Sequence, residues 1–195
     1  MTLHTAEPQT DGPHTDGPGL DGRPDAAVPA QPVVVTPLPT GAEVRELLNG
    51  LFDRPVTVQE EPEPVLPGRG VCVVGSYVDQ DGGIRALAMT DLVLGCGLGA
   101  ALALVEAARV TEALESGAVP VDLADNTQEV LGIASSLFAA AAGAVRLRAV
   151  QVAPDPVPDD VVAFLRAEPH RSDLTIEVPG YGTGVLVLLL ARDGT

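Results

Sequence analysis

The chain has 195 residues, of which 46% are apolar and only 3% aromatic, and it contains no tryptophan. This content suits one small domain whose core is built from Val, Leu, Ala and Ile rather than from large rings. Its formal net charge of −16 repels phosphate backbones and anionic lipid, so neither nucleic acid nor a membrane surface is an expected partner.

The amino-terminal segment, residues 1–38, is predicted to be a disordered tail. Residues 1–40 hold eight of the 18 prolines, and the tetrapeptide TDGP occurs twice among them. Such a segment cannot bury enough apolar surface to offset the entropy lost on ordering. We therefore assign the single folded domain to residues 39–195.

The cellular compartment is inferred from the start of the chain and from its cysteines. The first ten residues lack the basic and apolar regions of a signal peptide. Cys72 and Cys96 form no CxxC motif, and two cysteines alone cannot build a metal site. We expect a cytoplasmic protein with both thiols reduced and no metal.

The first predicted helix covers residues 40–52. Thr40 is followed three residues later by Glu43, which is the spacing of a capping box. Apolar residues recur at helical spacing on one face. These are Val44, Leu47, Leu48 and Leu51.

A β-rich region follows this helix. A short strand is predicted over 56–59 and a loop over 60–68, where glutamate and proline crowd together. Two β-type segments, 71–79 and 84–89, are joined by Asp-Gly-Gly. This junction predicts a hairpin, because glycine supplies the positive φ that the turn needs.

A long helix is predicted to begin at Thr90 or Asp91 and to run to about Ser116, where Gly117 ends it. Its first half contains Gly95-x-Gly97-x-x-Ala100, which formally fits the dinucleotide-binding fingerprint. The cap, however, places these glycines inside the helix, and no second strand ending in an acid follows. We interpret them as packing contacts and expect no cofactor.

Another helix is predicted to follow directly, from Asp122 or Asp125 to about Ala142. One stripe of it is apolar and should be buried: Leu123, Val130, Ala134, Leu137, Phe138 and Ala141. A second stripe should face outward, and we call it the Glu129 stripe: Asn126, Glu129, Gly132 and Ser136.

The rest of the chain predicts a strand over 144–152, a short helix over 159–166, and a second hairpin made of 174–178 and 184–190. Paired hairpins around two long consecutive helices are typical of an α+β domain with an antiparallel-rich sheet. This is the predicted fold class.

Side chains that commonly carry catalysis do not come together in the sequence. Cys96 has no histidine near it, Ser135 and Ser136 lie in a helix without a base, and His170 lies in a loop. The carboxylates are numerous but do not cluster with histidine or cysteine, so neither a metal site nor a glycosidase site is indicated.

The segment DNTQEVLGIASSLF, residues 125–138, resembles the signature helix of the CheC/CheX family of chemotaxis phosphatases. The order of elements over residues 41–190 also resembles that family, which implies a CheX-like fold. In the family, a Glu and an Asn three residues later project from one helical face. The Glu pairs with a basic residue of the phosphorylated receiver protein CheY, and the Asn amide orients the water that attacks the aspartyl phosphate. This chemistry requires positioning but no nucleophile.

Glu129 matches the family Glu, and Gly132 stands at the Asn position. The resemblance therefore implies a bacterial chemotaxis or signalling domain that docks on a response-regulator receiver, or on a copy of itself, with weak or no phosphatase activity. Two alternatives stay open. One is an active phosphatase that uses Asn126, one turn earlier, or Asn49, which ends an E-x-x-N quartet beginning at Glu46. The other is an interaction module unconnected to phosphorelay.

Overall fold

The computed structural model describes residues 38–52, 54–65, 70 and 72–192. The predicted tail, except for Leu38, lies outside these residues. The described strands form one six-stranded sheet with the order β1-β5-β6-β3-β2-β4. All its pairings are antiparallel. The strands are β1 (Thr57–Glu61), β2 (Val73–Val78), β3 (Ile84–Thr90), β4 (Arg146–Val152), β5 (His170–Val178) and β6 (Gly182–Leu190).

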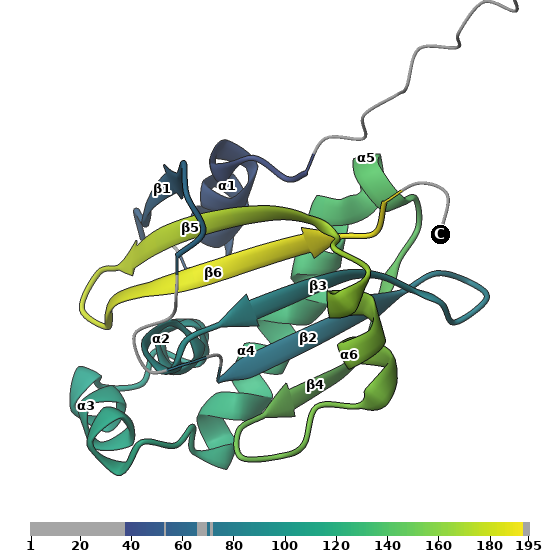
Figure 1. Ribbon diagram of the computed structural model, residues 1–195. Coiled ribbons are helices and arrows are strands. Elements are labelled where there is room, and N and C mark those ends of the chain that lie inside the picture. The colour runs from purple at the N-terminus through teal and green to yellow at the C-terminus, as the bar shows by residue number, and fades with distance from the viewer. Residues whose placement is uncertain (1–37, 53, 66–69, 71, 193–195) are drawn as a thin grey trace, which may run out of the picture. The chain divides into compact units, whose positions relative to one another are not determined.

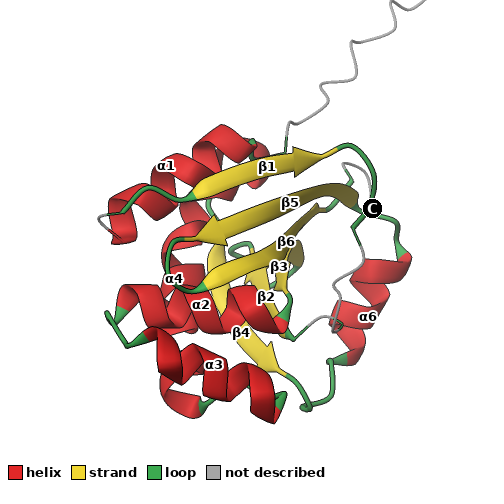
Figure 2. Ribbon diagram, turned by 90° about the vertical axis from the view of Figure 1, so that its left-hand side faces the viewer, coloured by secondary structure: helices red, strands yellow, loops and turns green. Residues whose placement is uncertain are grey.

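Helices cover both faces of this sheet, as Figures 1 and 2 show. Helices α1, α2 and α4 lie on one face, and α6 lies on the other. The predicted α+β class with an antiparallel sheet is confirmed. The helices are α1 (Gly41–Phe52), α2 (Leu92–Leu102), α3 (Ala107–Ser116), α4 (Val121–Ile133), a 3₁₀ segment η1 (Ala134–Phe138), α5 (Ala139–Ala142) and α6 (Asp159–Arg166).

The sheet separates two hydrophobic cores because successive strand residues point to opposite faces. In β3, Ala86 and Ala88 belong to the larger core beneath α1, α2 and α4. Leu87 and Met89 belong to the smaller core, which α6 covers with Val161. Both hairpins predicted from the glycine turns are present: β2 pairs with β3 and β5 pairs with β6, each pair antiparallel.

The connection that leaves β1 starts at the edge of the sheet, and three strands separate β1 from β2. Val65 in this connection packs against the smaller core. Its backbone N–H donates to Asp173 Oδ1 on β5 at 3.0 Å. Arg171 clamps the same carboxylate with two hydrogen bonds of 2.7 Å. The predicted loop over 60–68 thus begins two residues late, after Glu61, and 66–69 lie outside the described residues.

The single long helix predicted after β3 is wrong: it is broken into α2 and α3. Leu104 takes a left-handed conformation with φ 54° just after α2 ends. The Val105 N–H then donates back to Ala100 O at 2.9 Å, a closure typical of helix ends. The Tyr181 hydroxyl, from the turn between β5 and β6, donates to Val105 O at 2.6 Å and holds the end of α2 in place. Glycine usually takes this position, so a leucine gave no signal of a break.

The next predicted helix has the right extent but not one conformation. It begins at Val121, behind Pro120, rather than at an aspartate cap, and it tightens into a 3₁₀ segment after Ile133. Two hydrogen bonds from side chains to backbone carbonyls lie at this transition. Tyr77 Oη donates to Leu131 O at 2.8 Å, and Ser136 Oγ donates to Ile133 O at 2.9 Å. Both occupy carbonyls of the last α-helical turn, which favours the change of geometry.

Candidate functional site on helix α4

Helix α4 is seated on α2 through the glycine-rich segment. A Cβ placed on Gly99 would lie 2.2 Å from Leu123 O and 2.7 Å from Thr127 Oγ1, so only glycine allows this approach. Thr127 Oγ1 lies 2.6 Å from Gly95 O and hydrogen-bonds to it across the helix pair. The prediction that Gly95 and Gly97 lie inside a helix is confirmed. A Cβ on Gly95 would lie 2.8 Å from Val73 Cγ2, which fits a packing contact, whereas a Cβ on Gly97 would meet only Tyr181 Cβ, at 3.5 Å.

The Glu129 stripe begins on α4 with Asn126, Glu129 and Gly132 and continues into η1 with Ser136. Glu129 and Ser136 are exposed, whereas Asn126 and Gly132 are half-buried. Beneath the stripe, Leu123, Val130 and Phe138 are buried as expected, and Leu137 is half-buried. The stripe is therefore at the surface but is not uniformly exposed.

Gly132 leaves a small hollow in the stripe. The nearest atom to a Cβ built there is Leu147 Cδ2 of β4, at 4.0 Å. That separation is ordinary van der Waals contact, so the backbone is bare but a side chain would fit. Beside it, Ile133 is 41% exposed, which makes an apolar spot in a polar surface.

The surface of α4 is acidic. Asp122, Asp125 and Glu129 are all exposed. Arg109 of α3 pairs with Asp122, its Nη2 lying 3.1 Å from Oδ1, and this hydrogen bond lowers the pKa of the Asp122 carboxyl. Among the described residues, Asp125 and Glu129 have no ion-pair partner. Their charges are thus available to a basic partner.

The candidate Asn49 lies near the end of α1, on a different helix from the Glu129 stripe. Its side-chain Oδ1 accepts a hydrogen bond of 2.7 Å from the Val56 backbone N–H. This bond fixes the turn into β1, so Asn49 has a structural task. The capping box at the other end of α1 is confirmed, with the Thr40 N–H donating to Glu43 Oε2 at 2.8 Å.

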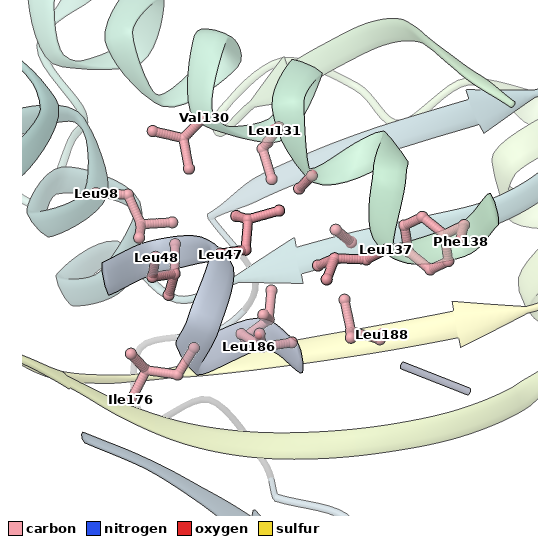
Figure 3. A pocket seen from close by; sticks show the side chains of 13 residues that line it. Leu47, Leu48, Leu98, Val130, Leu131, Leu137, Phe138, Ile176, Leu186 and Leu188 are labelled. Carbon is pink, nitrogen blue, oxygen red and sulfur yellow. The ribbon is translucent and has the colours of Figure 1, made fainter. Parts of the chain in front are cut away.

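Figure 3 shows the interior between α1, α4 and the sheet. A cavity of about 20 Å³ lies there, room for roughly one water molecule. Its walls are entirely apolar, so it has no group to bind or transform a substrate. The lining comprises Val44, Leu47, Leu48, Ala88, Leu98, Val130, Leu131, Ala134, Leu137, Phe138, Ile176, Leu186 and Leu188.

Other catalytic chemistry finds no support in the described part of the chain. No group of three His, Cys, Asp or Glu side chains there is placed to hold a metal ion. Cys72 and Cys96 are buried and free, and burial raises the pKa of Cys96 to about 12, so its thiol is not a nucleophile at neutral pH. No helix of the described chain is long and apolar enough to cross a bilayer.

Comparison with known proteins relates this architecture to solved structures only. No family model matches the sequence, and no curated protein matches it. A chain of the FliM–SpeE complex from H. pylori is 7% identical, with 77% of this chain and 81% of that chain covered and a TM-score of 0.50. At 7% identity this likeness shows a shared fold and nothing beyond the fold.

Two further solved structures are similar at lower TM-scores. The FliM middle domain from Vibrio alginolyticus is 13% identical, covering 77% of this chain and 88% of that chain at a TM-score of 0.48. A chain of the CheX–CheY–BeF3–Mg complex from Borrelia burgdorferi is 9% identical, covering 75% and 92% at a TM-score of 0.45. At TM-scores below 0.5, neither likeness carries a conclusion about this chain.

Proposed function

We propose that the chain is a signalling domain that docks on a response-regulator receiver through the Glu129 stripe and hydrolyses its aspartyl phosphate weakly or not at all. The observation that carries this proposal is Gly132, which lies on the same helical surface as Glu129, at the Asn position of the CheC/CheX motif. A glycine has no amide to hold an attacking water, whereas the docking carboxylate three residues earlier is present.

The charge of the surface supports docking. Glu129 is exposed and has no ion-pair partner among the described residues, so it can pair with a basic residue of a partner. A net charge of −16 favours encounter with a basic patch and disfavours encounter between two copies of the chain at low salt. We therefore favour docking on a receiver over association of two copies of this chain.

An active phosphatase remains the second candidate, because Asn126 lies on the same stripe. It is half-buried, and it precedes Glu129 rather than following it, so its amide would act from the opposite side of the carboxylate. Asn49 is a weaker choice, since its Oδ1 already binds the Val56 N–H.

The test is a titration of the full chain with receiver domains, phosphorylated and unphosphorylated, followed by phosphate release. Glu129→Ala should weaken receiver binding and leave the melting temperature unchanged, because an exposed Glu contributes little to stability. Gln128→Ala, at an exposed neighbour on the same helix, is the control and should bind like the wild type.

Catalysis is tested separately with Gly132→Asn, which should raise the dephosphorylation rate above that of the wild type. Rapid dephosphorylation by the wild type, abolished in Asn126→Ala, would overturn the degenerate-phosphatase proposal in favour of the second candidate. Equal receiver binding by Glu129→Ala and Gln128→Ala would mean that the receiver does not dock through the Glu129 stripe.

A further inference from the structure

A second surface feature lies at the opposite face of the sheet from α4. Here a pocket of about 180 Å³ opens where β3 begins, β6 ends and α6 ends. The Ala191 N–H donates to Arg85 O at 2.8 Å, which continues the β3–β6 pairing by one residue past β6. This bond brings the residue that follows, Arg192, to the same end of the sheet as Arg85, and both line the pocket. Figures 1 and 2 show α6 on this face.

The charge of this pocket is opposite to that of the chain. Among the residues that the structure describes, its lining includes two arginines and no carboxylate, although the chain has 27 acidic and 11 basic residues. The other surface pockets described differ: both Asp79 and Arg146 line one of them, and Glu43 lines another. Arg85 is half-buried and Arg192 is exposed, and each also interacts within the chain, so a ligand would add to or replace those interactions.

The rest of the lining is apolar and includes Ile84, Phe164 and Pro169. Guanidinium groups bind carboxylate and phosphate oxygens in pairs, and in a partly buried recess these bonds are screened less by water. The volume of about 180 Å³ is enough to admit a small anion. The apolar walls favour an anion with a short hydrocarbon portion.

We propose that this pocket binds a small organic oxyanion, a carboxylate or a phosphate with a short apolar portion, between Arg85 and Arg192. The site is independent of the Glu129 stripe, and it stands or falls without the proposed receiver docking.

The experiment is a calorimetric titration of the full chain with acetate, butyrate and inorganic phosphate at constant ionic strength, with chloride as the reference anion. Saturable binding is expected, and butyrate should exceed acetate because each buried methylene adds up to about fourfold in affinity. Tighter binding of butyrate than of phosphate assigns a carboxylate ligand, and the reverse assigns a phosphate.

Variants show whether the two arginines are responsible. Arg85→Gln and Arg192→Gln should each weaken binding about tenfold or more, since each removes a charged hydrogen bond. Arg166→Gln is the matched control, because Arg166 is exposed on α6 and does not line the pocket. Arg192 is itself exposed, so its variant keeps the test valid if Arg85→Gln fails to fold. Absence of saturable binding at tens of millimolar, or equal binding by Arg192→Gln and Arg166→Gln, would overturn the proposal.

Discussion

Replacing Gly99 with alanine tests how closely α4 is seated on α2. The added Cβ would lie 2.2 Å from Leu123 O and 2.7 Å from Thr127 Oγ1. The first of these atoms belongs to the backbone of α4, so it cannot rotate away as the end of a flexible side chain does. The two helices must therefore separate, and the buried hydrogen bond between Thr127 Oγ1 and Gly95 O must lengthen or break.

The magnitude follows from three contributions. Overpacking costs about 1–3 kcal/mol, and a buried hydrogen bond left unmade costs about 1–3 kcal/mol. Alanine returns about 1 kcal/mol of helix propensity relative to glycine. The net expectation for Gly99→Ala is a loss of about 3 kcal/mol, which lowers the melting temperature by about 6–12 °C in a domain of this size.

The assay is thermal and urea unfolding of the variant beside Gly97→Ala. Gly97 lies in the same helix, but its added Cβ meets only Tyr181 Cβ, at 3.5 Å. That control should be unchanged or up to about 1 kcal/mol more stable. Equal melting temperatures for the two variants would refute the close seating of α4 on α2.

Three further predictions concern stability. Gly132→Ala should raise the free energy of unfolding by up to about 1 kcal/mol in urea unfolding, because the position is helical and has room for a Cβ. A loss of stability would mean that the added methyl group does not fit there. Asp173→Asn should lower the free energy of unfolding by about 1–3 kcal/mol in urea unfolding, since the buried carboxylate binds Arg171. Arg148→Gln, which removes an exposed ion pair with Asp160, should lower it by less than about 1 kcal/mol. Burial raises the pKa of Asp91 in the folded state, so its contribution to stability falls as pH rises from its unfolded pKa through the folded one. Asp91→Asn, which keeps a capping side chain, should therefore be at least as stable as the wild type at pH 7, and this difference should close below about pH 4 in urea unfolding.

Local signals in the sequence were sufficient for much of the fold. The Thr40–Glu43 spacing predicted a capping box that the structure contains. The Asp-Gly-Gly turn predicted the β2–β3 hairpin, in which Asp79 Oδ1 accepts from the Gly83 N–H at 2.9 Å. Features that depend on distant partners could not be predicted. The break at Leu104 depends on a hydrogen bond from Tyr181, 76 residues from its acceptor Val105.

The same division applies to the candidate site. Helical periodicity placed Asn126, Glu129, Gly132 and Ser136 on one stripe, because spacing along a helix is a local property. It did not predict that Asn126 and Gly132 are half-buried, since burial depends on neighbours such as Leu147 of β4. Nor could it predict the Arg85–Arg192 pocket, whose two arginines are 107 residues apart and meet only through the pairing of β3 with β6.

The contact between α2 and α4 at Gly99 also determines where the Glu129 stripe lies. Because α4 rests on the α2 backbone at Gly99, its position is set by contact between two helices rather than by flexible side chains. Glu129→Ala should then reduce receiver binding without changing stability, whereas Gly99→Ala should reduce both, since it displaces the whole helix. Both variants are compared well below their melting temperatures, with circular dichroism as the control for folding. If Gly99→Ala binds the receiver as the wild type does, the placement of α4 does not determine docking, and the partner must contact another surface.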